Sequence, residues 1–228
     1  MSPEELADRY HAIRHRVAAA CKHAGRVPAD VTIIGVTKTK PAAAIRAAAE
    51  AGITEIGENY VQELVAKHAG LGAIVRWHFI GHLQRNKVRE IVSFVDLIHG
   101  VDSERLGVEI DRRAADAGRR MPVLVQVNTS GEASKSGVAP ADLPALVERL
   151  AQLPGLDVQG LMTIPAIFDD PEGVRPMFRM LRTLRDELRR STGLPLSHLS
   201  MGMTGDFEVA VEEGATMVRI GTALFGHR

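Results

Sequence analysis

Two lysines follow the first apolar run of the chain, in the stretch VTIIGVTKTKP, where Lys38 ends the run and Lys40 precedes a proline. Side chains alternate between the faces of a strand, so Ile34, Val36 and Lys38 share one face and Thr37 points the other way. Apolar surroundings favour the neutral form of an amine, which attacks aldehydes to form Schiff bases. A lone lysine is ordinarily a solvated surface charge, which is what we expect of Lys40. The interpretation of Lys38 therefore depends on what lies across from it.

Small residues and hydroxyls late in the chain are typical of a phosphate site. The stretch SMG contains Ser200, Met201 and Gly202, and the stretch GT contains Gly221 and Thr222. Backbone N–H groups in such loops, together with serine and threonine hydroxyls, donate hydrogen bonds to phosphate oxygens. Either glycine alone could simply end a strand, but the two together favour a phosphate cradle.

Arg219 lies two residues before Gly221, so the period-two alternation of a strand sends both to the same side. A lysine for an aldehyde, a phosphate cradle and a partner for a ring nitrogen are the three requirements for binding pyridoxal 5′-phosphate (PLP). A guanidinium keeps its protons at ordinary pH, so Arg219 would donate to the ring nitrogen and leave that nitrogen unprotonated. This arrangement weakens the ring as an electron sink and disfavours reactions that pass through a quinonoid.

Eight apolar runs, which we expect to be strands, alternate with segments of helical periodicity. The strands are expected at 31–38, 54–58, 75–80, 96–101, 122–128, 157–164, 197–201 and 216–220. The helices between them are expected at 41–51, 60–68, 84–94, 103–117, 140–152, 172–191 and 205–213. This alternation predicts an α/β fold, a (β/α)8 TIM-type barrel whose active end is the C-terminal end of its strands. A doubly wound open sheet is the alternative.

A further helix precedes the first strand, with Ser2 as its N-cap, Pro3 at its first position and Glu5 completing a capping box. Its apolar stripe includes Cys21, which is therefore expected in the core. The chain ends just after the eighth strand, so we expect this N-terminal helix to stand in for the missing eighth helix. No linker divides the chain, and residues 1–228 are expected to form a single PLP-binding barrel domain.

The overall composition argues against several classes of function. The 28 basic and 28 acidic residues balance, which argues against nucleic acid or an anionic membrane as a partner. The single cysteine is typical of a reducing compartment, and no apolar run has the length that spans a bilayer. We therefore expect a cytoplasmic protein. The expected outer helices show no long apolar stripe, which favours a monomer.

Three further features are interpreted as structural. His78 and His82 lie four residues apart without an obvious third ligand, so no metal site is expected. The loop 130–137 lacks the residue order of a P-loop and is expected to cover the mouth of the barrel, with the reach of Lys135 to the phosphate left open. Arginines crowd the segment 175–190, which we interpret as a solvated outer face, with a partner-docking face as the alternative.

Seven motifs together resemble those of one known family. They are VTKTKP, GENYVQE, WHFIGHLQRNK, SKSG, GLMTIP, LSMGM and MVRIGTALFG. In this order and spacing they resemble the YggS/PROSC family, the pyridoxal phosphate homeostasis proteins, over nearly the whole chain, and the third motif is the most specific. The family is similar in fold to the barrel domain of bacterial alanine racemase.

The resemblance implies a site and a role. It implies PLP bound as an aldimine on Lys38, and the residues around the cofactor would be Asn59, His78, Ser200, Met201, Arg219, Gly221 and Thr222. Of these, Arg219 would lie near the ring nitrogen, while Asn59 and His78 lie elsewhere near the cofactor. The resemblance also implies a protein without established turnover, hence without catalytic residues, that holds, buffers or delivers PLP within vitamin B6 metabolism. Apo forms of PLP-dependent enzymes would be its transient partners.

Two enzymatic functions stay open on the residues alone. A PLP-dependent racemase or decarboxylase is the first, but a racemase needs an acid or base on each face of the substrate carbon. The two tyrosines are Tyr10, on the N-terminal helix, and Tyr60, at a helix start. Tyr60 could approach the mouth of the barrel, but we expect it to pack against its neighbours. An aldolase-like barrel is the second, in which Lys38 would act on a phosphosugar without PLP.

Overall fold

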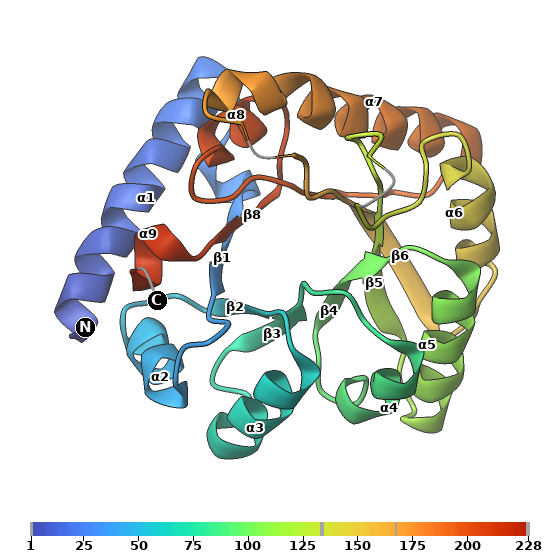
Figure 1. Cartoon of the computed structure of the whole chain (residues 1–228), viewed down its shortest axis with the longest axis horizontal. Helices are drawn as coiled ribbons and strands as arrows, with labels where there is room; N and C mark the ends of the chain where they lie inside the picture. The colour runs from blue at the N-terminus through green and yellow to red at the C-terminus, as the bar shows by residue number, and fades with distance from the viewer. Residues whose placement is uncertain (1, 133–134, 167, 227–228) are drawn as a thin grey trace.

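Eight parallel strands form a closed barrel at the centre of the computed structural model, which describes residues 2–132, 135–166 and 168–226 (Figure 1). The strands are β1 (Thr32–Val36), β2 (Glu55–Glu58), β3 (Arg76–Phe79), β4 (Leu97–Val101), β5 (Met121–Gln126), β6 (Leu156–Met162), β7 (His198–Ser200) and β8 (Met217–Ile220). Each strand pairs with the next, and β8 returns to β1 with Arg219 opposite Ile34. The predicted (β/α)8 barrel is thus confirmed, because an open sheet would not join β1 to β8.

Helices surround the barrel in chain order (Figure 1). They are α1 (Pro3–His23), α2 (Ala42–Glu50), α3 (Val61–Leu71), α4 (Val88–Ile91), α5 (Glu104–Asp116), α6 (Leu143–Ala151), α7 (Arg175–Thr192), α8 (Phe207–Glu212) and α9 (Thr222–Phe225), with 3-10 turns η1 (Pro28–Asp30), η2 (Arg85–Lys87) and η3 (Pro171–Val174). The segments expected at 84–94 and 172–191 both start as 3-10 turns, which apolar periodicity does not distinguish from α-helix. Within the described ranges, no helix has the length and apolar character needed to cross a membrane.

The N-terminal helix α1 closes the ring of helices. Its capping box is formed, because the Ser2 hydroxyl accepts the Glu5 N–H at 3.1 Å and the Glu5 carboxylate accepts the Ser2 N–H at 2.8 Å. Along its length α1 contacts α2, α8 and α9, and it fills the space between α8 and α2 in Figure 1. The expectation that it stands in for an eighth helix is confirmed, although the chain adds the single turn α9 after β8.

Side-chain alternation along the strands separates the inside of the barrel from the layer beneath the helices. The apolar residues that cluster inside the barrel are Ile34, Leu97, Leu124, Met162 and Met217. A larger cluster lies between the outward faces of the strands and the helices, so the barrel is a filled core rather than a pore. Ile34 and Met217 face inward, so the residues two positions further along their strands also face inward. Those residues lie nearer the C-terminal mouth of the barrel.

The arginines of α7 bind acids at the end of α8. Glu213, whose side chain is 5% exposed, pairs with Arg175, Arg179 and Arg182 at 3.2, 2.8 and 3.2 Å. Burial alone raises the pKa of Glu213, but hydrogen bonds from Arg179 and Arg175 lower this pKa below its ordinary value overall. The network ties α7 to the segment before β8. The interpretation of this face as solvated therefore holds for the exposed Arg179, Arg189 and Arg190, while Arg175, Arg182 and Arg185 are half-buried.

We expect Glu213→Gln to lower the free energy of unfolding by about 1–2 kcal/mol at neutral pH, because it weakens several charge-assisted hydrogen bonds at once. The folded-state pKa of Glu213 lies below its unfolded value, so its contribution is present above the unfolded pKa of about 4.5 and is lost as pH falls through the folded pKa. Urea titrations of the parent and variant between pH 7 and pH 3 measure this difference, which should shrink in acid. Glu172→Gln is the control, since exposed Glu172 pairs with Arg175 alone among the described residues and its loss should cost less. Equal losses in the two variants would contradict the prediction.

Candidate functional site

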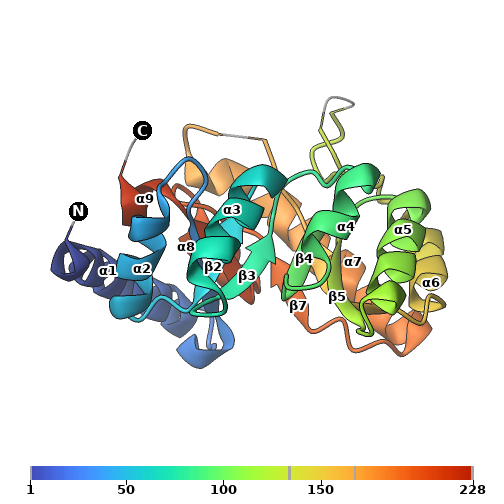
Figure 2. The same cartoon turned by 90° about the horizontal axis from the view of Figure 1, so that it is seen from below.

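A cavity of about 480 Å³ opens at the C-terminal ends of the strands, the end at which the sequence predicts the site. Its wall includes Lys38 after β1, Asn59 after β2, Arg219 on β8, and Gly221 and Thr222 after β8. An adjoining hollow of about 440 Å³ shares Lys38, Gly221 and Thr222. Figure 2 shows the barrel from the side, with α9 at the upper left. These predicted residues, which are distant in sequence, therefore share one cavity wall.

Lys38 reaches the cavity through a tight turn at the end of β1. The strand ends at Val36, which lines the cavity, and the Lys40 N–H donates to the Thr37 carbonyl at 2.9 Å. Thr37 is fully buried and points away from the cavity, where its hydroxyl donates to Glu58 Oε1 at 2.6 Å. The structure thus has the alternation that the sequence predicts for residues 36–38.

A buried ion pair holds the turn that carries Lys38. Lys67 on α3 donates to Glu58 Oε1 at 2.7 Å and to the Thr37 carbonyl at 2.9 Å. Lys67 also pairs with Glu63 at 2.9 Å, and Glu63 accepts the Thr39 N–H at 2.8 Å. Thr39 has a φ of +64°, a left-handed conformation that needs such support in a β-branched residue. The sequence analysis did not predict these contacts, although the i, i+4 spacing of Glu63 and Lys67 indicates that the two side chains can pair on a helix.

Arg219 is buried, and two partners fix its guanidinium. Its Nη1 donates to Ser200 Oγ at 2.6 Å and its Nη2 donates to the Thr163 carbonyl at 2.9 Å. Burial lowers the pKa of Arg219 to about 10, against the opposing effect of Asp206. The side chain therefore still carries its positive charge at neutral pH. It presents a fixed, charged donor to the cavity.

Three predicted site residues lie behind the cavity wall. Ser200 is fully buried inside the barrel, where its hydroxyl meets His99 as well as Arg219. Met201 is buried in the outer apolar cluster, and His78 lies inside the barrel between Glu55 and His99. The Ser200 hydroxyl and the His78 ring are therefore not among the groups that line the cavity. Both are inward-facing residues that lie deeper in the barrel than Lys38.

The cavity wall also contains residues that the sequence did not single out. Asp206, just before α8, lines the cavity, and its Oδ1 accepts the Met203 N–H at 2.6 Å. Burial raises the pKa of Asp206, and the Met203 hydrogen bond and the charge of Arg219 oppose this rise. Ile164 and Phe168 form an apolar part of the rim. Such rim residues come from loops, whose placement depends on packing that sequence periodicity does not report.

Asn59 supplies an acceptor that the described part of the chain leaves unpaired. Its Oδ1 is buried without a hydrogen-bond partner, although Asn59 lines the cavity. A Cβ at Gly81 would overlap the Asn59 carbonyl, so the glycine allows the chain after β3 to pass close to it. An unpaired buried acceptor is costly, so this position fits a ligand that donates a hydrogen bond.

Lys40 and His82 each lie close to another polar group. Lys40 is not simply solvated, because its ammonium donates to the Gly226 carbonyl at 3.2 Å. His82 is 62% exposed beside Asp102, and no group of three metal-ligating side chains occurs among the residues described. The expected covering loop 130–137 contains residues 133 and 134, which lie outside the described ranges. In the part that is described, Lys135 is not among the residues lining the cavity.

Gly202, just after β7, passes close to α8. Its φ is +93°, and a Cβ there would lie 2.5 Å from the Ala210 side chain. We expect Gly202→Ala to lower the free energy of unfolding by about 2–4 kcal/mol, because strain in the backbone adds to a collision in the core. Gly205→Ala is the matched control nearby, since a Cβ there meets nothing within 4 Å. Thermal unfolding of both variants measures the difference, and a Gly202→Ala variant as stable as Gly205→Ala would contradict the strain argument.

Comparisons with known proteins agree with this arrangement. The family model described as alanine racemase, N-terminal domain, matches residues 9–228. A pyridoxal phosphate homeostasis protein of Aquifex aeolicus is 47% identical over 222 residues, 97% of each chain. The solved structure of PipY of Synechococcus elongatus with PLP bound has a TM-score of 0.85 at 39% identity and covers 97% of this chain and 100% of that one. Alanine racemase of Clostridium difficile is 16% identical, with a TM-score of 0.75 over 97% of this chain and 57% of its own, and shows a shared fold alone.

Proposed function

The chain belongs to the family of pyridoxal phosphate homeostasis proteins, and from this premise we propose that it binds PLP at the mouth of the barrel through a Schiff base on Lys38. One observation carries the proposal: Lys38 shares a cavity wall with the charged donor Arg219 and with Gly221 and Thr222. An amine, a guanidinium and a small-residue loop are the three groups that an aldehyde, a pyridine nitrogen and a phosphate require. The chemistry of the wall therefore fits PLP.

Different residues of the cavity wall would bind different parts of PLP. Lys38 would hold the aldehyde carbon of PLP through its amine, with loss of water. Arg219 donates to the ring nitrogen, while the backbone at Gly221 and the hydroxyl of Thr222 bind the phosphate. The unpaired Oδ1 of Asn59 accepts a hydrogen bond from the bound molecule. Bound there, PLP would supply an electron-withdrawing ring. Ser200 would influence this ring by holding the guanidinium of Arg219, without contacting the ring itself.

The proposed role is to hold and deliver PLP without turning over a substrate. A positively charged donor at the ring nitrogen disfavours carbanion chemistry, and a racemase would also need an acid or base on each face of the substrate carbon. Tyr10 lines a different cavity and Tyr60 is 49% exposed outside the Lys38 cavity, so neither is placed as that partner. The single barrel domain would then act as a cytoplasmic monomer that passes PLP to apo-enzymes in brief encounters.

Mixing experiments test this function against the enzymatic alternative. The purified protein is saturated with PLP and then incubated with D- and L-amino acids, and the visible spectrum and the products are followed together. The proposal predicts a visible absorption band, no racemised or decarboxylated product, and activation of an added apo-enzyme. Steady formation of product would instead favour a PLP-dependent racemase or decarboxylase. A protein that stays colourless in excess PLP would contradict PLP binding and favour the aldolase-like alternative.

A further inference from the structure

A chain of polar side chains crosses the inside of the barrel and ends at Arg219. It starts at Glu55 on β2, whose Oε2 lies 2.6 Å from His78 Nε2. Nδ1 of His78 lies 2.9 Å from Nε2 of His99, on β4, and Nδ1 of His99 lies 2.9 Å from Ser200 Oγ. Arg219 Nη1 donates to the same oxygen at 2.6 Å. The three middle members are buried, so these contacts are shielded from water.

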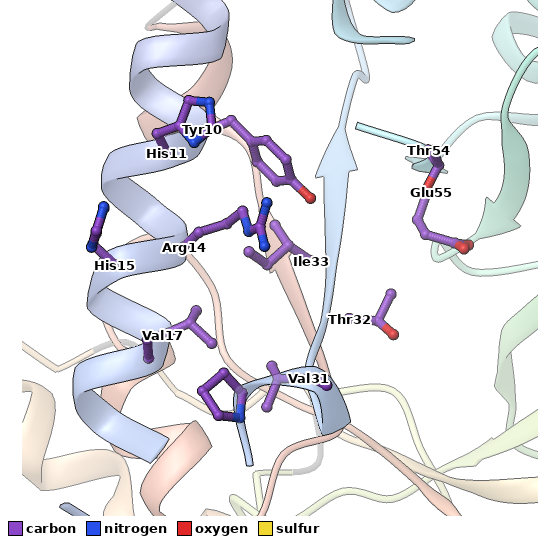
Figure 3. Close-up of a pocket in the computed structure, with 13 residues that line it drawn as sticks. Tyr10, His11, Arg14, His15, Val17, Val31, Thr32, Ile33, Thr54 and Glu55 are labelled. Carbon is purple, nitrogen blue, oxygen red and sulfur yellow. The ribbon is translucent and has the colours of Figure 1, made fainter. Parts of the chain in front are cut away.

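The far end of this chain lies at a second cavity, of about 710 Å³, between α1, η1 and the first residues of β1 and β2. Figure 3 shows Tyr10 and Arg14 extending from α1 toward Ile33, and Glu55 on the other side of β1. Glu55 is 17% exposed, and Arg76 lies 3.7 Å from its carboxylate. The side-chain contacts thus connect this second cavity to the wall of the Lys38 cavity.

The chemistry of the two ends fixes the direction of every hydrogen bond between them. A guanidinium can only donate and a carboxylate can only accept. Ser200 Oγ accepts from Arg219, so its own proton is free to go to His99 Nδ1. His99 must then carry its proton on Nε2 and donate it to His78 Nδ1. His78 in turn donates from Nε2 to Glu55, and each neutral ring uses its one donor and one acceptor.

A proton added to His78 would leave this chain unsatisfied. The imidazolium would donate from Nδ1 to His99, and His99 would then donate from Nδ1 to Ser200. The Ser200 oxygen would accept from both sides, and its hydroxyl proton would lose its acceptor inside the barrel. Burial lowers the pKa of His99 well below its ordinary value, and the charge of Arg219 lowers it further. Burial raises the pKa of Glu55, but the His78 hydrogen bond and Arg76 lower it overall, so Glu55 is ionised.

We propose that Glu55, His78, His99 and Ser200 are positioning residues that form a one-way hydrogen-bond chain, in which both imidazoles are neutral Nε2–H tautomers and Ser200 offers a fixed acceptor to Arg219. The chain, together with the Thr163 carbonyl, holds the guanidinium so that its remaining N–H groups face the cavity. The effect of this hydrogen-bond chain on the ring nitrogen of PLP rests on the proposed function, whereas the tautomers of the two histidines do not depend on it. Glu55 at one end of the barrel thereby orients the guanidinium of Arg219 at the other end.

The tautomers are tested in the ligand-free protein. Two-bond ¹H–¹⁵N NMR spectra of ¹⁵N-histidine-labelled protein distinguish Nδ1–H, Nε2–H and imidazolium rings, and His78→Gln and His99→Gln variants assign the two signals. The proposal predicts an Nε2–H tautomer for each ring, as the hydrogen-bond directions require. A protonated His78, or an Nδ1–H tautomer of either ring, would overturn it. This result does not depend on PLP, so it stands even if the proposed function fails.

The coupling to the cavity is tested by variants at the far end. Glu55→Leu removes the terminal acceptor, Glu55→Gln keeps an acceptor oxygen, and Tyr10→Phe alters the same cavity without touching the chain. We expect about tenfold weaker PLP affinity and a displaced pH profile of the visible band for Glu55→Leu only, since one charge-assisted hydrogen bond is lost. Parent-like affinity and pH profile in a folded Glu55→Leu variant would overturn the coupling. If the Glu55→Leu variant does not fold, the tautomers of His78 and His99 in the parent protein decide whether the proposal stands.

Discussion

Replacement of Lys38 by alanine or arginine should abolish the visible absorption band of the PLP-loaded protein. Neither side chain forms a Schiff base at ordinary pH, since alanine has no amine and an arginine guanidinium is always protonated. We expect PLP affinity to fall by about a hundredfold or more, which corresponds to about 2.8 kcal/mol. Absorbance and fluorescence titrations with PLP measure both effects. Lys38→Arg keeps the positive charge, so it separates loss of the covalent bond from loss of the charge.

Lys40→Ala is the matched control for this prediction. Lys40 lies two residues from Lys38 and borders the adjoining hollow, but its ammonium binds the Gly226 carbonyl at the edge of the barrel. We expect Lys40→Ala to keep the visible band and to bind PLP with an affinity within a few-fold of the parent protein. If instead the band were lost in Lys40→Ala and kept in Lys38→Ala, the assignment of the anchor would be wrong.

Replacement of Lys67 by methionine should destabilise the barrel more than Glu213→Gln or Gly202→Ala. It leaves Glu58, which is fully buried and already has one unpaired oxygen, without its cation. Removing one partner of a buried ion pair costs about 3–5 kcal/mol. It also removes the donor to the Thr37 carbonyl, so PLP binding at Lys38 should weaken as well. Urea unfolding and PLP titration of the same variant measure the two effects.

A double variant and a change of pH give the controls. Lys67→Met combined with Glu58→Leu removes both charges, and replacement of a whole buried pair is often nearly neutral, so stability should largely return. Burial raises the pKa of Glu58 above its ordinary value of 4.5, against hydrogen bonds from Lys67 and Thr37. The Lys67→Met variant should therefore lose stability as pH rises through the folded-state pKa and regain it in acid. A double variant as unstable as the single one would contradict the ion-pair account.

The sequence predicted the barrel and the cavity-facing lysine because both depend on short-range periodicity. Alternation along β1 is enough to place Val36 and Lys38 on one side and Thr37 on the other, and the structure has that arrangement. The same reasoning placed Arg219 and Gly221 together, and both line the cavity. Strand boundaries were predicted within a few residues, because turn residues and apolar runs delimit them in the sequence.

The depth of a side chain within the barrel was not predictable in this way. The resemblance placed Ser200 and His78 near the cofactor, but period two does not say how far along the barrel axis each residue lies. Their depth depends on the register between strands, such as Ser200 opposite Met217 and His78 opposite Leu97. The partners of Glu58 and Glu213 were missed for a related reason. Lys67 and the arginines of α7 meet them only because helices pack on the barrel in one particular orientation.

The assignment of Lys38 as the covalent anchor is tested most directly by borohydride reduction followed by peptide mapping. The PLP-loaded protein is reduced, which converts any Schiff base into a stable secondary amine, then digested and analysed by mass spectrometry. We predict a phosphopyridoxyl adduct on the peptide that contains Lys38, with fragment ions that place it on that residue rather than on Lys40. An adduct on another lysine, or no adduct after incubation with excess PLP, would contradict the account.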